Sequence, residues 1–390
     1  MLPKTSHPKL IICFILEYYY PHVGGGEILF QKLAEGLVKE GHQCDVITCR
    51  LPGTKRFEVV NGVNIYRVRV PRFADRYWFT FMSIPLAWRI AKRADIIHTM
   101  SYNGAFPAWL IARLQKKPVI ISFLEVLGEK WMELNFNFPA AFLCRLIENM
   151  ILHLPYDGYS CNSKSAMNCL IDWGIDSKKA FLAYPGIDNQ LFKQKTDEEA
   201  KRIREKLGIN GSTFLYSYYG RPGMVKGIEY LVRAVPLIKK KIPDSKLLLI
   251  LSKDPSTKYK EIINLIKTLN LDNVIVHDSI PREMLPYYIQ ATDCVVVPSL
   301  SEGFGFTCLE ACTMGKPVVA SNVGSIPEVI FGRYVLASPR DPEALADGVA
   351  KIARGEHETG EQKVFLWKNT VQKHLKAYYK IISKRETSGT

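Results

Sequence analysis

The sequence predicts an α/β protein with two doubly wound domains, each a mostly parallel sheet with helices on both faces. Its 390 residues exceed what one ordinary hydrophobic core contains. Short apolar runs of strand length alternate with stretches of helical periodicity over about the first 160 residues. The alternation begins again after the segment 184–206, which predicts a second domain there.

The elements expected in the first domain follow from this periodicity. Strands are predicted at 9–16, 44–49, 95–99, 118–123 and 156–162, with a hairpin at 59–70 around the turn Asn61-Gly62. Helices are predicted at 28–39, 74–93, 104–115 and 140–152, and Ser163 is expected to cap a further helix.

The second domain repeats the pattern. Strands are predicted at 214–219, 246–251, 274–277, 294–297 and 317–320. Helices are predicted at 228–241, 257–269, 282–291, 307–314 and 342–353. The last segment, 362–383, carries apolar residues at helical spacing and is expected to be an amphipathic helix.

Composition excludes several classes of protein. With 47% apolar and 23% charged residues the chain is typical of a soluble globular protein, and no apolar run approaches the length of a membrane span. The first twenty residues do not resemble a signal peptide, so a cytoplasmic location is expected. The nine cysteines form no Cys-x-x-Cys pair, and no histidine lies near Cys308 and Cys312 to complete a metal site.

The net charge of +14 is concentrated in part at residues 50–93, which hold ten lysines and arginines against Glu58 and Asp75. Aromatic residues are interleaved with these cations. Such a segment suits an anionic membrane surface or a polyanionic acceptor, and its alternative interpretation is a solvated basic face over core aromatics. Nucleic acid is not an expected partner, because the sequence contains no recognised nucleic-acid module.

The segment 299–311 predicts a nucleotide-sugar site. It follows the apolar strand at 294–297 and places Glu302 in a glycine-bearing loop and Glu310 on the next helix. A strand, a glycine loop and a helix start direct backbone N–H groups and the positive end of the helix dipole at a phosphate. A carboxylate two turns into the helix can reach a ribose hydroxyl.

Two other loops suit the same ligand. Arg221 and Lys226 lie in a glycine-rich loop after a strand and could neutralise a diphosphate leaving group, unless this loop is an exposed basic turn. The glycines 24–26 follow the first strand and permit close approach of the backbone to a ligand, or form a tight turn only. His98 and Glu125 come at the ends of two strands, where ligands of open α/β sheets bind.

These motifs together resemble the retaining nucleotide-sugar glycosyltransferases of family four, which have the GT-B fold. The resemblance covers nearly the whole chain, and the matching segments follow one another in the same order as in the family. They are 21–27, 95–98, 184–188 with Phe192, 220–226, 287–328, and the last helix with Trp367 and Tyr378. The resemblance implies two facing Rossmann-like domains with a cleft between them. It implies an acceptor-side domain at 1–190, a donor-binding domain at 191–361, and a C-terminal helix, 362–390, that returns to the first domain.

The resemblance also implies roles for single residues. Arg221 and Lys226 would hold the diphosphate, Glu310 the ribose hydroxyls and Glu302 the donor sugar. Backbone groups of Phe304, Gly305 and Phe306 would line the sugar and phosphate, Gly25 would approach the diphosphate, and His98 would line the acceptor side. His98, Glu302, Arg221 and Lys226 are thus the expected catalytic residues, with no metal ion and no cofactor apart from the donor.

The sequence departs from the family beside the acceptor. Many relatives have His-x-His where this chain has His98-Thr99-Met100, and a histidine where it has Glu125. A core role for His98 is therefore the alternative. The loop 331–334 is also shorter than usual.

The expected activity is retaining hexosyl transfer from an NDP-sugar to a lipid-linked or surface-glycan acceptor at the cytoplasmic membrane face. The alternatives are a nucleotide-sugar 2-epimerase and a catalytically silent GT-B subunit.

Overall fold

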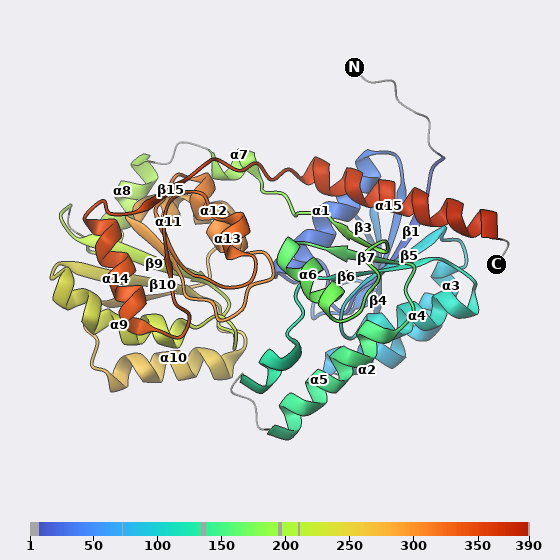
Figure 1. Cartoon of the computed structure of the whole chain (residues 1–390), viewed down its shortest axis with the longest axis horizontal. Helices are drawn as coiled ribbons and strands as arrows, with labels where there is room; N and C mark the ends of the chain where they lie inside the picture. Colours follow the sequence, from blue (N-terminus) through green and yellow to red (C-terminus); the bar gives the residue numbers. More distant parts are fainter. Residues whose placement is uncertain (1–7, 72, 134–137, 194–196, 210, 389–390) are drawn as a thin grey trace, which may run out of the picture. The chain divides into compact units, whose positions relative to one another are not determined.

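The structure is a computed structural model of the chain, and it describes residues 8–71, 73–133, 138–193, 197–209 and 211–388 (Figure 1). The chain divides into two compact units. The first consists of Met1–Gly186 and Phe365–Thr390, and the second of Ile187–Val364. The domain boundaries expected after residues 190 and 361 lie after residues 186 and 364 in this division.

The first unit contains an eight-stranded sheet with the order β3-β4-β2-β1-β5-β6-β7-β8. Its strands are β1 Ile11–Ile15, β2 Gln43–Cys49, β3 Phe57–Val60, β4 Val63–Val68, β5 Ile96–Met100, β6 Val119–Phe123, β7 Gly158–Cys161 and β8 Ala180–Leu182. Neighbouring strands are parallel except in the β3–β4 hairpin. In that hairpin the turn residues Asn61 and Gly62 both have positive φ, 50° and 81°, as a two-residue Asn-Gly turn requires.

Helices cover both faces of this sheet. They are α1 Gly25–Lys39, α2 Asp75–Met82, α3 Ile84–Ala91, α4 Ala105–Leu114, the 3-10 helix η1 Gly128–Glu133, α5 Phe138–His153 and α6 Lys164–Asp172. The helical stretch expected at 74–93 is confirmed, and it consists of two helices that meet at Ser83. Pro85 lies at the start of α3, where its missing N–H and its ring interrupt a continuous helix.

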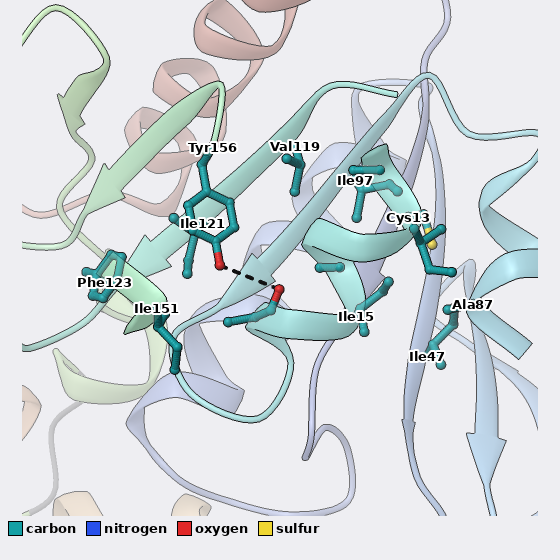
Figure 2. Packing of buried hydrophobic residues seen from close by; sticks show 14 of the residues in the cluster. Cys13, Ile15, Ile47, Ala87, Ile97, Val119, Ile121, Phe123, Ile151 and Tyr156 are labelled. Atoms are coloured by element: carbon teal, nitrogen blue, oxygen red, sulfur yellow. Dashed lines mark hydrogen bonds between the residues drawn. The ribbon is translucent and has the colours of Figure 1, made fainter. Parts of the chain in front are cut away.

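Apolar residues of the central strands form the core on one face of the sheet. Figure 2 shows Ile15, Ile97 and Ile121 from three adjacent strands packing together with Tyr156, whose hydroxyl donates to the carbonyl of Ala105 at 3.5 Å. These side chains are fully or almost fully buried. The core therefore holds the parallel strands in register, and with them the loops at their carboxyl ends.

On the other face the chain returns as α15, Trp367–Ser388, which lies against α1 and the sheet of this unit (Figure 1). Val371, Leu375 and Tyr378 are buried in this interface. The hydroxyl of Thr370 donates to the carbonyl of Tyr184 at 2.6 Å. The expected return of the C-terminal helix is confirmed, although the helix begins at Trp367 rather than at 362.

The second unit contains a seven-stranded sheet with the order β11-β10-β9-β12-β13-β14-β15. Its strands are β9 Phe214–Gly220, β10 Ser245–Leu251, β11 Val274–Asp278, β12 Cys294–Val297, β13 Val318–Ser321, β14 Gly332–Ala337 and β15 Glu358–Gly360. All pairings are parallel except β14–β15. The expected loop at 331–334 is wrong, because this segment opens β14.

The helices of the second unit are α7 Asn189–Phe192, α8 Asp197–Lys206, α9 Ile228–Lys241, α10 Ser256–Thr268, the 3-10 helix η2 Arg282–Met284, α11 Leu285–Ala291, α12 Phe306–Thr313, α13 Ile326–Val329 and α14 Pro342–Ala353. Two largely parallel sheets with helices confirm the predicted fold class. Among the described helices, none has both the length and the apolar character to span a membrane.

Candidate active site

Glu302 lies at the centre of a hydrogen-bonded loop between β12 and α12. Its carboxylate accepts from the Ser299 hydroxyl at 3.0 Å and from the Lys226 ammonium at 2.8 Å. Its carbonyl accepts two more bonds, from the backbone N–H and the hydroxyl of Ser325, both at 3.1 Å. With its side chain 14% exposed and held at both ends, Glu302 is positioned before any ligand binds.

Two glycines bring the loops of the site together. Gly324 has φ of 52°, and a Cβ there would lie 2.2 Å from the carbonyl oxygen of Glu302. Gly227 has φ of 60°, and a Cβ there would lie 2.0 Å from the carbonyl oxygen of Pro298. Both positions require glycine for conformation and for space. The chain therefore places the Lys226 turn directly against the loop that carries Glu302.

The predicted cations Arg221 and Lys226 differ in their surroundings. Lys226 is one-third exposed and contacts Glu302, and its turn is fixed by a 2.7 Å bond from the N–H of Leu300 to the carbonyl of Val225. Arg221 lies at the other end of the loop, directly after β9, and is exposed. The guanidinium is thus at the surface at the carboxyl end of the sheet.

Glu310 lies on the second turn of α12 and is almost fully buried, with its side chain 4% exposed. The guanidinium of Arg282 donates to its Oε1 at 2.8 Å. Burial raises the pKa of the Glu310 carboxyl, and the positive charge of Arg282 acts in the opposite direction. The carboxylate is therefore charge-paired with Arg282 in an environment whose burial opposes the charge.

The start of α12 forms the third part of the site. Gly305, with φ of 88°, is the N-cap and has no side chain that could cap the helix. Phe304 and Phe306 flank it with ring centroids 5.1 Å apart. The Tyr219 hydroxyl donates to the carbonyl of Thr307 at 2.9 Å, which ties the helix start to β9. The backbone N–H groups of this first turn suit an anion.

Sequence reasoning missed three residues of this site: Arg282, Ser299 and Ser325. Arg282 follows β11 and also stacks over the ring of Phe192 at 5.4 Å. Its position after a strand end was a usable signal, because the carboxyl ends of parallel strands meet at one edge of the sheet. Ser299 and Ser325 carry no such signal, because only the folded loops bring them within hydrogen-bond distance of Glu302.

In the first unit, Gly25 is the first residue of α1. The neighbouring Gly26 has a packing role: a Cβ there would lie 2.9 Å from the sulfur of Met100 and from a methyl group of Leu124. The glycine run therefore lets the start of α1 lie against the ends of β5 and β6. A role for Gly25 in donor binding stays a prediction.

His98 is a core residue of the first unit. It is fully buried on β5, its Nδ1 lies 2.7 Å from the Tyr378 hydroxyl, and its Nε2 lies 2.8 Å from the Ser122 hydroxyl. Burial, together with the nearby His374, lowers the pKa of His98 well below its usual value. This placement corresponds to the alternative of a core histidine, and the acceptor-side role stays a prediction. Glu125, just past β6, is half-buried.

A large hollow of about 1150 Å³ lies in the first unit within the basic and aromatic segment 50–93. Arg50 and Arg69, directly after β2 and β4, line it together with Asp75 of α2. Most aromatics of this segment are exposed: Phe73, Tyr77, Trp78, Phe81 and Trp88. Phe79 by contrast is fully buried. The alternative interpretation, in which the aromatic residues of this segment belong to the core, therefore holds for Phe79 and not for the five exposed residues.

Two mostly parallel sheets covered by helices are the architecture of the GT-B class of glycosyltransferases. The family model Glycosyl transferases group 1 matches residues 199–365, and Glycosyltransferase Family 4 matches residues 23–191. D-inositol 3-phosphate glycosyltransferase from Corynebacterium aurimucosum is 34% identical over 294 residues, which are 70% of this chain and 68% of that protein. The chain belongs to glycosyltransferase family four.

Solved structures share the fold. Sucrose-phosphate synthase from Thermosynechococcus elongatus has a TM-score of 0.74 at 23% identity, covering 97% of this chain and 98% of that one. HepE from Anabaena, solved in complex with UDP-glucose, has a TM-score of 0.72 at 17% identity, covering 97% and 100%.

Proposed function

We propose that this glycosyltransferase transfers a hexose from a nucleoside diphosphate sugar with retention of the anomeric configuration and without a metal ion. The observation that carries the proposal is the pairing of Lys226 with Glu302 at 2.8 Å in two interlocked loops, beside the start of α12. A cation, a carboxylate and a helix N-terminus at one edge of a sheet suit a diphosphate attached to a sugar. The UDP-glucose complex of HepE, which has the same fold, supports this donor class.

In this mechanism the bond between the anomeric carbon and the phosphate oxygen breaks first, and its electron pair goes to the diphosphate. Lys226, Arg221 and the first-turn N–H groups of α12, from Phe306 on, stabilise the developing negative charge. The backbone of Phe304 and Gly305 borders the sugar. The acceptor hydroxyl attacks on the same face and gives its proton to the departing phosphate.

The two carboxylates bind hydroxyl groups in this proposal. Glu302 accepts from a hydroxyl of the donor sugar, because its position is already set by Ser299 and Ser325. Glu310 accepts from the ribose hydroxyls and is kept charged by Arg282. Positioned hydrogen bonds of this kind convert binding energy into correct orientation of the anomeric carbon.

Donor binding and stereochemistry test the proposal directly. We expect one of the UDP-, GDP- and ADP-sugars at about 100 Kd to raise the melting temperature by roughly 5 °C or more, with and without EDTA. Product NMR with that donor and an anionic glycan acceptor should show the donor's anomeric configuration. Inversion, or a shift abolished by EDTA, would contradict it. Epimerisation of UDP-GlcNAc without acceptor would instead establish a 2-epimerase, and binding without any transfer would establish a silent subunit.

We further propose that the acceptor is anionic and glycan- or lipid-linked, and that the enzyme meets it at the cytoplasmic face of a membrane. Arg50 and Arg69 in the hollow of the first unit provide cations for such an acceptor. Exposed Tyr77, Trp78 and Phe81 on α2 have the amphipathic character of membrane-interface residues.

Vesicle co-sedimentation measures this membrane contact. At low salt the protein should sediment with vesicles that contain phosphatidylglycerol and stay in solution with pure phosphatidylcholine. Trp78→Glu should reduce the bound fraction several-fold, because it introduces an anion at the lipid surface. Val59→Glu, at an exposed apolar position of β3, is the matched control and should have little effect. Equal losses in both variants would remove the role of α2.

A further inference from the structure

A groove of about 500 Å³ lies in the first unit between α15 and strand β8, which ends the sheet. None of its lining residues is among those assigned above to donor or acceptor binding. Seven of its lining residues are cations: Lys178, Lys179, Lys373, Lys376, Lys380, Lys384 and Arg385. The one acidic residue among the described residues that line the groove is Asp157. The guanidinium of Arg385 donates to both of its carboxylate oxygens at 3.1 Å. The groove is therefore strongly positive.

The cations come from two separate segments of the chain. Lysines 373, 376, 380 and 384 follow one another at spacings of three and four, which places them on one face of α15. They extend over about 16 Å at 1.5 Å per residue. Lys178 and Lys179 face them from the segment that leads into β8. A chain-like ligand could contact both walls along this length.

The orientation of the lysine face is set by contacts on the opposite side of α15. The Ser160 hydroxyl and His374 Nε2 lie 3.0 Å apart, and Thr370 is bonded to Tyr184. Tyr378 is fully buried. Because these contacts prevent rotation of the helix, the lysines are presented toward the groove as a fixed array.

Helix stability does not explain this array. Lysines near a helix C-terminus interact favourably with the dipole, but Lys373 and Lys376 lie in the first half of α15. The pairs 376/380 and 380/384 are like charges at i,i+4, an arrangement that destabilises a helix. A repeated unfavourable arrangement, faced by two more lysines from another segment, indicates a binding role.

We propose that this groove binds a linear anionic glycan, so that the enzyme holds its acceptor or product chain at a second place. The glycan identity rests on the proposed function. Lysine ammonium groups are compact charges that suit carboxylate, sulfate or phosphate groups spaced along a chain. The apolar residues Phe181, Leu182 and Ile381 between the cations suit the C–H faces of sugar rings.

Two other polyanions fit the groove less well. The ring of Phe181 packs perpendicular to that of His374, with centroids 5.4 Å apart, and it is the one aromatic ring among the described residues that line the groove, so the groove offers no series of rings on which successive nucleic-acid bases could stack. A lipid bilayer is flat, whereas the cations here lie on both walls of a hollow. The geometry therefore favours a single flexible chain.

The test measures binding of a fluorescein-labelled heparin oligosaccharide, a linear sulfated glycan, to the full chain by fluorescence anisotropy. K376E/K380E should weaken binding at least tenfold. The control K240E/K260E makes the same change in net charge at exposed lysines of the second unit and should weaken it less than twofold. K376A/K380A should also weaken binding, and it provides the test if the glutamate variant fails to fold. Equal weakening by groove and control variants would overturn the proposal.

Further measurements distinguish the groove from the donor site, and a glycan chain from DNA or lipid as its ligand. Lys226→Ala should retain heparin binding, so a failed donor site and a failed groove give different results. Unlabelled heparin should compete at concentrations at least tenfold below those of single-stranded DNA with the same number of charges. Equal competition by the DNA, or displacement by phosphatidylglycerol vesicles at the same anion concentration, would show that the occupant is not a glycan chain.

Discussion

Replacing Lys226 with alanine should lower the turnover number by about 10²–10³-fold, because the variant loses one fixed positive charge at the departing diphosphate. The ammonium lies 2.8 Å from Glu302 in the free enzyme and is one-third exposed, so it is both oriented and reachable by a donor. Ligand phosphate can therefore replace or share the carboxylate as its partner. Single-turnover kinetics with saturating donor would measure the loss on the chemical step.

Lys253→Ala is the matched control for this variant. Lys253 belongs to the same unit and also pairs with a carboxylate, Asp278, at 2.8 Å, but it is 65% exposed. Its removal should leave the turnover number nearly unchanged. A Lys226→Ala enzyme that is folded by circular dichroism and has near-normal turnover would exclude the proposed leaving-group role.

Acidification should destabilise the first unit strongly through His374. Burial lowers the pKa of His374 from 6.5 to about 4, with a smaller opposite effect from its bond to the carbonyl of Thr370. In the unfolded chain the ring binds a proton near pH 6.5, whereas in the folded protein it stays neutral until about pH 4. The neutral imidazole therefore contributes its full stabilisation above pH 6.5. As the pH falls to 4, this contribution to the free energy of unfolding is lost, which amounts to about 3 kcal/mol.

Denaturant unfolding at a series of pH values measures this loss. His374→Gln keeps a neutral hydrogen-bonding side chain between Ser160 and Thr370 and should flatten the decline of unfolding free energy between pH 6.5 and 4. The signal should be taken from the first unit, for example by hydrogen exchange in α15, because the two units need not unfold together. An unchanged decline in the variant would show that other groups cause it.

Buried strands made much of the fold predictable. The run 294–297 is continuous and apolar, and the run 214–219 is apolar apart from Ser217, so their positions and the loops after them followed directly. This is why the sequence could associate Lys226 with Glu302, which the structure places 2.8 Å apart. Strands β14 and β15 were missed, because β14 is only partly buried and β15 has three residues.

The prediction for His98 shows a second limit. It rested on a strand expected to end at residue 99, which placed the imidazole at the sheet edge. The strand β5 continues to Met100, and His98 pairs in register with Phe14 and Ile120 of its neighbours. Its side chain then faces Tyr378, 280 residues further along the chain. A contact of such sequence separation is determined by tertiary packing and carries no local signal.

The late return of α15 has a consequence for how the protein is made. At a synthesis rate of about 5–20 residues per second, the 178 residues between Gly186 and Phe365 take on the order of 10–40 s to translate. During that time the second unit, a continuous segment, can fold on the ribosome, while the first lacks the helix that buries Phe30 and Leu33. A chain that ended before Trp367 would carry the complete second unit but an exposed apolar surface on the first, which makes it a substrate for chaperones and proteases.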